Sequence, residues 1–314
     1  MKTWVVGAGE TAIEYVKVLQ AMQRDFVVVG RGEESARRLR EATGAEVVTG
    51  GLQAFLETHP EKPDNAINCV RVKDLKAINE QLVDYGVGRI LSEKPGIYEP
   101  SDIHALVEKC REAGAEVYIA YNRRFYASVL KAEEIIEADG GLLSCNFEFT
   151  EWAHVFESMG LPMSEFKYLF LGNSTHVVDL VFFFCGEPRQ MASYSSGTTG
   201  WHTPSNYAGA GVTEKDVLFS YNANWNAPGR WGVELLTSRH RIYLKPMEQL
   251  QLQDKGSVKV YPVEIDDRLD KEYKPGFFLE VKAFLEGDGT RLCTIEEQES
   301  HIQHIYGKMA GQQW

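Results

Sequence analysis

The first 120 residues alternate short apolar runs with stretches of helical periodicity. Runs of consecutive apolar residues are typical of parallel strands that are covered on both faces. Strands and helices that alternate along the chain predict an α/β domain with a doubly wound parallel sheet, the Rossmann arrangement. The predicted strands are residues 3–6, 26–29, 46–48, 66–70, 89–91 and 117–120, and the predicted helices are residues 11–22, 34–42, 75–85 and 101–113.

After about residue 122 the rhythm changes, because most of the following segments read as strands with few helices between them. Such a run of strands predicts an α+β domain with a largely antiparallel sheet. We therefore expect two domains, residues 1–121 and residues 122–314. The predicted strands of the second are 142–151, 190–196, 216–225, 232–237, 240–245 and 258–263, and its predicted helices lie near 176–185, 276–285 and 295–309.

Composition excludes several classes of protein. The 314 residues are 44% hydrophobic and 25% charged, which is typical of a globular chain and not of a disordered one. A formal net charge of −12 disfavours nucleic acid and anionic membranes as partners. The sequence contains no apolar run long enough for a membrane-spanning helix. Five scattered cysteines without a C-x-x-C pattern indicate free thiols, so we expect a cytoplasmic protein.

A glycine-rich turn joins the first predicted strand to the first predicted helix. Gly7, Gly9 and Ala12 form the pattern G-x-G-x-x-A. The first glycine permits a tight turn, the second lets a pyrophosphate approach the backbone, and the small third residue lets helix and strand pack closely. The helix N-terminus then offers N–H groups to the anion. We expect residues Gly7, Ala8, Gly9, Glu10 and Thr11 to bind a dinucleotide; the alternative is a plain tight turn.

The residues after the second predicted strand bear on the choice between NAD(H) and NADP(H). An NAD site usually places Asp or Glu there, whereas this chain has Gly30 followed by Arg31. A guanidinium pairs with a 2′-phosphate, so we predict NADP(H), with Arg31 as the main anchor and Ser35 as a second donor. The alternative is that Arg31 is a solvated turn residue beside Glu33 and Glu34.

Later motifs carry a family resemblance. They are Glu93-Lys94-Pro95, Y-N-R-R-F at residues 121–125, H-x-x-D at His176 and Asp179, P-G-R-W at 228–231 and F-x-x-E-V-x-x-F at 277–284. Together they resemble the glucose–fructose oxidoreductase and inositol dehydrogenase family (Gfo/Idh/MocA). The resemblance implies an NAD(P)-dependent oxidoreductase of sugars, inositols or sugar derivatives. It also implies an open-faced C-terminal sheet that forms a homodimer or homotetramer.

The resemblance assigns roles to individual residues. It places Lys94 near the nicotinamide and the substrate hydroxyl, with Glu93 on the cofactor side, and it allows a cis bond before Pro95. Asn122 and Arg123 would line the nicotinamide side. His176 matches the usual catalytic histidine and Asp179 the carboxylate one turn later. The family often has an acid four residues before that histidine, where this chain has Gly172.

The chemistry of these residue types is consistent with hydride transfer. A cation such as Lys94 stabilises the charge that develops on a ketone oxygen during reduction. His176 titrates near neutral pH and suits general acid–base catalysis, while Asp179 shares its helix face and could orient it or hold a substrate hydroxyl. We expect Tyr168 to be a substrate contact or an alternative proton donor. Four basic residues could hold an anionic substrate group: Arg123, Arg124, Lys167 and Arg230.

Each of these residues also has a purely structural interpretation. Lys94 could be a solvated charge, His176 a core residue, Asp179 a surface acid and Tyr168 a packing aromatic. His301 and His304 have a spacing that can bind metal, but no third ligand is evident in the sequence. We therefore expect no metal, and we expect these two histidines on a solvated helix face.

The sequence thus predicts an NADP(H)-dependent, or less favourably NAD(H)-dependent, oxidoreductase. It would transfer a hydride to or from a carbinol or ketone carbon of a sugar or sugar derivative, nucleotide-linked ones included. One alternative is a non-catalytic dinucleotide-binding sensor or partner module. Another is a reductase of an imine or tetrapyrrole, because fold alone does not determine the substrate.

Overall fold

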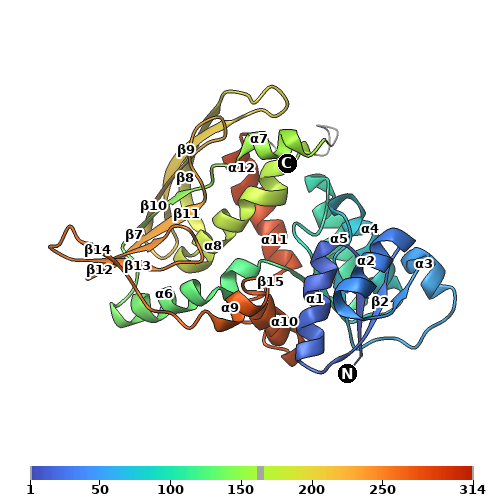
Figure 1. Cartoon of the computed structure of the whole chain (residues 1–314). Coiled ribbons are helices and arrows are strands. Elements are labelled where there is room, and N and C mark those ends of the chain that lie inside the picture. Colours follow the sequence, from blue (N-terminus) through green and yellow to red (C-terminus); the bar gives the residue numbers. More distant parts are fainter. Residues whose placement is uncertain (1, 161–165, 313–314) are drawn as a thin grey trace. The chain divides into compact units, whose positions relative to one another are not determined.

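The computed structural model describes residues 2–160 and 166–312, and the chain divides into two compact units (Figure 1). The first unit comprises Met1–Asn122 and Leu269–His301, and the second comprises Arg123–Arg268 and Ile302–Trp314. We expected one continuous C-terminal domain from residue 122. Residues 269–301 instead belong to the first unit. In that unit α10 (Phe277–Glu286) packs on α1 (Glu10–Ala21), and β15 (Cys293–Thr294) pairs with β6 (Glu116–Ile119).

The first unit contains a seven-stranded sheet in the order β15-β6-β5-β4-β1-β2-β3, parallel except for β15. This confirms the doubly wound parallel sheet that the alternating pattern predicted. Its strands are β1 (Lys2–Val6), β2 (Asp25–Val29), β3 (Val47–Val48), β4 (Asn65–Asn68), β5 (Arg89–Ser92), β6 (Glu116–Ile119) and β15 (Cys293–Thr294).

The first helix of this unit, α1 (Glu10–Ala21), buries the apolar positions that its periodicity predicts. In α1 the residues Ala12, Ile13, Val16 and Leu19 are buried, as their spacing along the sequence predicts. The helices are α1 (Glu10–Ala21), α2 (Glu33–Thr43), α3 (Gly51–Leu56), α4 (Leu75–Asp84), α5 (Ile103–Ala113), α10 (Phe277–Glu286) and α11 (Ile295–His301), with 3₁₀ turns η1 (Val72–Asp74) and η2 (Pro100–Asp102).

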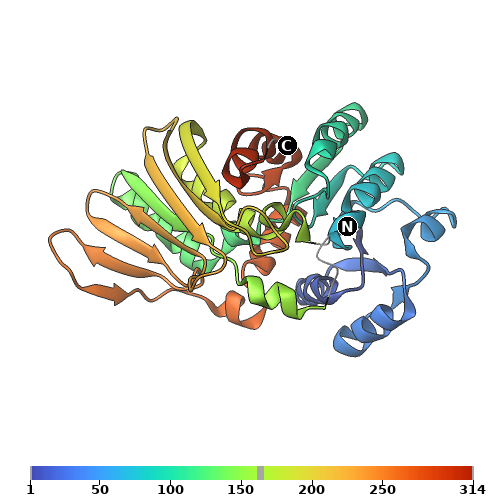
Figure 2. The same cartoon turned by 90° about the horizontal axis from the view of Figure 1, so that it is seen from above.

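The second unit contains an eight-stranded sheet in the order β14-β13-β12-β11-β7-β10-β9-β8. Its strands pair antiparallel except for β7 with β10, which confirms the largely antiparallel sheet (Figure 2). The strands are β7 (Ser144–Glu148), β8 (Pro188–Ser196), β9 (Asn206–Thr213), β10 (Leu218–Asn224), β11 (Gly232–Leu236), β12 (His240–Leu244), β13 (Gln251–Asp254) and β14 (Val260–Pro262).

One face of this sheet is covered by helices, with α6 and α8 on the same side (Figure 1). Nine of the eleven residues of α8 are buried, and the helix packs on β7 and β11. The helices of the second unit are α6 (Ala127–Ala138), α7 (Ala153–Ser158), α8 (Thr175–Cys185) and α12 (Gly307–Ala310), with π-type turns η5 (Phe170–Ser174) and η6 (Ile302–Tyr306). Two short helices span the borders between the units: η3 (Asn122–Phe125) and α9 (Arg268–Glu272).

Several elements were not predicted from the sequence. The strand β9 was missed because NYAGAGVT is rich in small residues; the rings of Tyr221 and Phe219 lie against Gly209 and Gly211, which leave room for them. The helices α3 and α6 and the strands β13 and β15 were also not predicted. A single helix was expected over 295–309, but the chain forms α11, η6 and α12 there.

His301 was expected on a solvated helix face, and this prediction is wrong. Its side chain is 1% exposed, because α11 packs against α5 and β6 of the first unit. All five cysteines, each of which the structure describes, are free and buried. Among the helices of residues 2–160 and 166–312, none is both long and apolar enough to cross a bilayer.

Candidate functional site

The glycine turn follows β1 directly, and its first glycine is required by the geometry. Gly7 has φ +129°, and a Cβ atom there would lie 2.6 Å from the carbonyl oxygen of Cys69. Its N–H donates to the carbonyl of Val29 at 2.9 Å. No residue with a side chain adopts this conformation in that space without strain. The turn therefore sets the direction in which α1 begins.

The N-terminus of α1 faces open space. Gly9 is the N-cap residue, and a Cβ atom there would meet nothing within 4 Å among the described residues. No side chain in that part of the chain caps the helix, so the N–H groups of its first turn are available to a ligand. An anion at this position would meet aligned N–H groups and the positive end of the helix dipole.

A cavity of about 930 Å³ opens at this helix end within the first unit. Its volume lies in the upper part of the range that is typical of pockets for small molecules and cofactors. It brings together all five residues predicted for the glycine turn and both predicted anchors of the adenosine end. These lining residues are Gly7, Ala8, Gly9, Glu10, Thr11, Arg31 and Ser35.

Three arginines line the part of this cavity beyond β2. The side chain of Arg31 is 68% exposed, and its Nη1 lies 3.4 Å from Asp74 Oδ2. Arg71 reaches the same carboxylate at 3.2 Å, and Arg38 is 3.8 Å from Glu10. Asp74 thus holds two guanidiniums near one point. The hydroxyl of Ser35, predicted as a second donor, donates to the carbonyl of Gly32 at 3.0 Å.

Arg71 and Asp74 were not singled out from the sequence. They lie beyond β4, about 40 residues from Arg31 along the chain, and only the parallel sheet brings the two loops together. The carboxyl ends of neighbouring parallel strands meet at one sheet edge, which is where ligands bind in such folds. Both residues follow a predicted strand, so this rule could have identified them as candidates from the sequence.

The turn that carries Lys94 is held by buried amides. Asn79 donates from Nδ2 to Ser92 Oγ at 2.9 Å and to the carbonyl of Gly96 at 3.2 Å, and it accepts from Asn68 Nδ2 at 2.8 Å. The Lys94–Pro95 peptide bond is cis, and the Pro95 carbonyl accepts from Gln298 Nε2 at 3.1 Å. The backbone on both sides of Lys94 is therefore fixed, while Lys94 itself is half-buried.

Glu93 connects this turn to α1. The hydroxyl of Tyr15 donates to Glu93 Oε1 at 2.9 Å, and the Tyr15 ring packs 4.7 Å from that of Phe277. Burial first, and then the charges of Glu93 and Glu280, raise the pKa of Tyr15 well above its ordinary value. Tyr15 therefore remains a protonated donor. Glu93, predicted on the cofactor side, does not line the cavity at the N-terminus of α1.

Asn122 and Cys69 complete the surroundings of this region. Asn122 donates from Nδ2 to the carbonyl of Pro275 at 2.9 Å, so its predicted contact with the nicotinamide stays a prediction. Burial and the nearby Glu93 raise the pKa of the Cys69 thiol well above its ordinary value. The thiol is therefore neutral, and its position beneath Gly7 makes it a packing residue.

In the second unit, three predicted residues converge on one indole. The guanidiniums of Arg123 and Arg230 lie 4.8 Å and 4.5 Å from the ring of Trp231. The ring of His176, at the start of α8, lies 5.9 Å from it. Burial lowers the pKa of Arg123, although a guanidinium remains charged at neutral pH. Trp231 was not singled out from the sequence, although it belongs to the quoted P-G-R-W motif.

Asp179 was predicted to contact substrate or to orient His176. Its two carboxylate oxygens instead accept from Arg124, Oδ2 from Nε at 2.9 Å and Oδ1 from Nη2 at 2.6 Å. The two side chains are 1% and 2% exposed. This bidentate pair fixes α8 to the segment after Asn122. Arg124, considered for an anionic substrate group, is buried in the pair.

Glu151 is a buried carboxylate that the sequence analysis missed. It follows β7, is fully buried, and accepts from Ser174 Oγ at 2.7 Å and Asn173 Nδ2 at 2.9 Å. Arg230 lies 3.7 Å away. Asn173 and Ser174 directly precede α8, so this carboxylate reaches the segment that includes Gly172. Its position just after a strand with alternating apolar and polar residues could have identified it as a candidate from the sequence.

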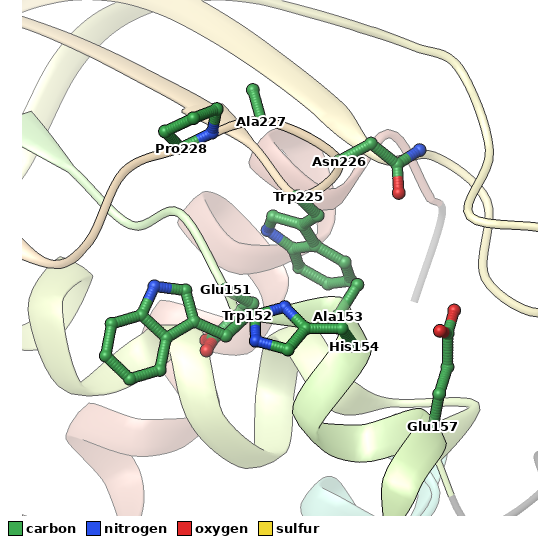
Figure 3. A pocket seen from close by; sticks show the side chains of 9 residues that line it. All are labelled: Glu151, Trp152, Ala153, His154, Glu157, Trp225, Asn226, Ala227 and Pro228. Atoms are coloured by element: carbon green, nitrogen blue, oxygen red, sulfur yellow. The ribbon is translucent and has the colours of Figure 1, made fainter.

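A smaller pocket of about 390 Å³ lies beside Glu151 in the second unit (Figure 3). It is lined by the segment from Glu151 to Glu157 and by residues 225–228, which follow β10. Tyr168, predicted as a substrate contact, does not line it and is half-buried, with the Lys167 ammonium 4.5 Å from its ring. The pocket was not predicted from the sequence, because its two walls are about 70 residues apart.

Comparison with protein families supports the dinucleotide site. Residues 1–121 match the model of the oxidoreductase family with an NAD-binding Rossmann fold, Gfo/Idh/MocA. This confirms the family resemblance and the class of cofactor, a nicotinamide adenine dinucleotide. A comparison with curated protein sequences found no match.

The whole chain is similar in fold to solved oxidoreductases. An oxidoreductase from Agrobacterium radiobacter in complex with NAD⁺, L-tartaric acid and magnesium is 12% identical, with 99% of this chain and 96% of that chain covered and a TM-score of 0.77. The UDP-N-acetylglucosamine 3-dehydrogenase GnnA from Acidithiobacillus ferrooxidans is 14% identical, with 100% and 97% covered and a TM-score of 0.76. The WlbA dehydrogenase from Bordetella pertussis in complex with NADH and UDP-GlcNAcA is 15% identical, with 97% and 94% covered and a TM-score of 0.71.

Proposed function

Because residues 1–121 have the NAD-binding Rossmann fold of the Gfo/Idh/MocA oxidoreductases, we propose that this chain is an NADP(H)-dependent oxidoreductase. It transfers a hydride to or from a carbinol or ketone carbon of a sugar or sugar derivative. The observation that carries the proposal is the cavity of about 930 Å³ at the N-terminus of α1, where the glycine turn meets three arginines.

The residues of this cavity fit the cofactor. When bound, the nicotinamide ring supplies the site that gives or accepts the hydride. The N–H groups that follow Gly9 hold the pyrophosphate, and the open space over Gly9 leaves room for it. Arg31 and Arg71 hold the 2′-phosphate in place of their contact with Asp74. The absence of a carboxylate directly after β2 supports NADP(H) over NAD(H).

Lys94 is the proposed catalytic cation. Its ammonium group stabilises the negative charge that develops on the substrate oxygen, and it donates a hydrogen bond there. The bonds from Asn79 and Gln298 hold its turn rigidly, so little reorganisation is needed during the reaction. Tyr15 is a positioning residue, because it acts on the turn only through Glu93.

His176 is the proposed general acid or base of the second unit. Its imidazole moves a proton to or from a substrate hydroxyl near neutral pH. Arg123 and Arg230, which lie with His176 around Trp231, contact the substrate as well. Asp179 contributes by holding Arg124, and Tyr168 is retained as a further substrate contact.

The proposal is tested by binding and turnover together. We expect the full chain to bind NADPH, seen as enhanced nicotinamide fluorescence, and to oxidise it with one member of a panel of ketosugars. Sugar nucleotides belong on the panel, since GnnA is a dehydrogenase of UDP-N-acetylglucosamine. Binding without turnover on the whole panel would favour the alternative of a non-catalytic sensor, or of a reductase of a non-sugar substrate.

Substitution of Lys94 gives the sharpest result. Lys94→Met should lower turnover about 10²- to 10⁴-fold, the usual range for a placed acid–base group, while NADPH binding persists. The control is Lys62→Met, an exposed lysine of the same unit, which should leave turnover unchanged. Activity retained by Lys94→Met would remove Lys94 from the mechanism.

The uncovered face of the eight-stranded sheet is the proposed contact between copies of the chain. Leu218 alternates with the inward Phe219 along β10, and its side chain is 60% exposed. Tyr194 of β8 lies on the same face of the sheet, because Tyr194 and Asn222 of β10 pair with the same residue of β9. Tyr194 is 72% exposed. We expect light scattering to give a homodimer or homotetramer. Combined Tyr194→Glu and Leu218→Glu should yield monomers; an unchanged mass would exclude this face.

A further inference from the structure

A carboxylate lies beside the arginines that are proposed to bind the 2′-phosphate. Asp74 lines the cavity at the N-terminus of α1, within the first unit. Its Oδ2 accepts from Arg31 Nη1 at 3.4 Å and from Arg71 Nε and Nη2 at 3.3 Å and 3.2 Å. The carboxylate and a 2′-phosphate therefore compete for the same N–H groups.

The Asp74 side chain does not cap the helix that it precedes. Asp74 ends η1 and is the N-cap residue of α4, where an aspartate commonly accepts from N–H groups of the first helical turn. Here the side chain makes no cap hydrogen bond, and the turn is closed by the backbone, whose Asp74 N–H donates to the carbonyl of Arg71 at 2.8 Å. The carboxylate is 36% exposed and faces the two arginines instead.

The charge of this cluster only partly matches a phosphate. Arg31 and Arg71 carry two positive charges and Asp74 one negative charge, so a single positive charge remains. The adjacent pair of Arg38 and Glu10, at 3.8 Å, adds no net charge. A phosphate monoester carries about −1.5 to −2 at neutral pH. Asp74 therefore presents a like charge to the 2′-phosphate and lowers the affinity for NADPH.

The same carboxylate suits a cofactor that lacks the phosphate. Both arginines bind Asp74 Oδ2, and no donor in the described part of the chain contacts Oδ1. In NAD sites the ribose 2′-hydroxyl donates to a carboxylate, usually one placed after the second strand. This chain has Gly30 there, but β2 and β4 flank β1, so the segment after β4 brings Asp74 to the same sheet edge.

We propose that Asp74 determines the ratio of affinities for NADPH and NADH. It accepts a hydrogen bond from the 2′-hydroxyl of NADH and repels the 2′-phosphate of NADPH, so it limits the preference that Arg31 and Arg71 create. The inference deepens the proposed function and rests on it, because the cavity at the N-terminus of α1 must hold the cofactor. It also means that the chain binds both cofactors.

The test removes the charge of Asp74 and keeps its shape. Asp74→Asn is titrated calorimetrically as the full chain with NADPH and with NADH, without substrate. We expect NADPH to bind about five-fold more tightly, because the like charge is gone. NADH should bind about three-fold more weakly, because a neutral oxygen accepts less strongly than a carboxylate. An unchanged ratio would overturn the proposal, and a lower one would show that Asp74 only positions Arg31 and Arg71.

Fragments and a matched control locate the effect. Adenosine 5′-phosphate and adenosine 2′,5′-bisphosphate differ only in the 2′-phosphate, and their ratio should shift in the same direction in Asp74→Asn. Asp74→Ser, a second neutral variant, should also raise the ratio. Asp84→Asn removes the same charge at the far end of α4, where Asp84 pairs with Lys109 at 2.6 Å, and should leave the ratio unchanged. An equal shift in Asp84→Asn would attribute the effect to net charge and overturn the proposal.

This outcome is separable from that of the proposed function, because the titrations contain no substrate. A chain that oxidises NADPH, but whose affinity ratio is the same in Asp74→Asn, keeps the proposed function and refutes the role of Asp74. A chain whose ratio rises in Asp74→Asn, but which never oxidises NADPH, keeps the role of Asp74 and refutes hydride transfer. A chain that binds neither cofactor refutes both.

Discussion

Arg31 and Arg124 show two uses of the same residue type in the two units. Arg31 is 68% exposed and touches Asp74 once, at 3.4 Å. Arg124 is 2% exposed and binds both oxygens of Asp179, at 2.9 Å and 2.6 Å. The first guanidinium can exchange its protein partner for a ligand phosphate at little cost. The second cannot, because removing either partner leaves a buried charge.

The difference separates binding from architecture. A ligand-binding cation must be desolvated by the ligand and not by the fold, so it lies at the edge of a cavity with a weak protein partner. A structural cation is already desolvated and fully paired. By this criterion Arg38 and Arg71 belong with Arg31, whereas Arg124 does not belong in the substrate site.

The largest expected effect is on Arg124. Arg124→Met should lower the free energy of unfolding by about 3–5 kcal/mol, because Asp179 then remains charged and buried. The double variant with Asp179→Leu should recover most of this loss. Urea unfolding measures both. As a control, Arg189→Met breaks an exposed pair with Asp216 and should cost less than about 1 kcal/mol. A loss below that value in Arg124→Met would show that the buried pair is not structural.

Arg31 should behave in the opposite way. Arg31→Met should weaken NADPH about 10- to 100-fold, the equivalent of a charged hydrogen bond, and leave NADH binding and stability nearly unchanged. Calorimetric titration with both cofactors measures this ratio, and the effect should shrink at high salt. Equal losses for NADPH and NADH would exclude a phosphate contact.

The pair of Asp139 and His240 lies between these extremes and should give the smallest effect. Burial opposes ionisation of Asp139, but hydrogen bonds from Thr237 and His240, each 2.6 Å long, lower its pKa below its ordinary value. A lowered carboxyl pKa stabilises the fold above the unfolded value of about 3.9, and this contribution is lost as the pH falls through the folded value.

Asp139→Asn should therefore flatten the loss of stability below about pH 4. Urea midpoints at neutral and acidic pH measure the slope, and Asp216→Asn, an exposed acid, provides the control. If Asp139→Asn were as acid-sensitive as the parent protein, the hydrogen bonds to Asp139 would not contribute to its stability.

Features encoded by neighbouring residues could be predicted from the sequence. The turn from Gly7 to Thr11 is such a case, since strand, glycines and helix are contiguous and the backbone itself forms the site. The apolar runs of the parallel strands and the buried stripe of α1 follow from periodicity in the same way. The motif around Lys94 could be located, but not the bonds from Asn79 and Gln298 that hold it.

Features that depend on distant segments could not be predicted. Glu151 and Trp225 form one pocket although the helices α7 and α8 and the strands β8, β9 and β10 lie between them in the chain. The burial of His301 depends on which helix packs over α11, and periodicity does not specify that. The return of residues 269–301 to the first unit likewise depends on pairing of β15 with β6.

By itself, the sequence determined a doubly wound dinucleotide-binding unit, a second sheet and a set of charged residues that are candidates for binding or catalysis. Local chain geometry is sufficient for that, because glycines, caps and periodic apolar positions act within a few residues of one another. Only the tertiary structure decided which of those charges stay available. It buried Arg124 with Asp179, left Arg31 exposed beside a cavity, and brought Glu151, Glu157 and Trp225 to the lining of one pocket. The free energy of a charge depends on its solvation and its partners, and folding alone sets both.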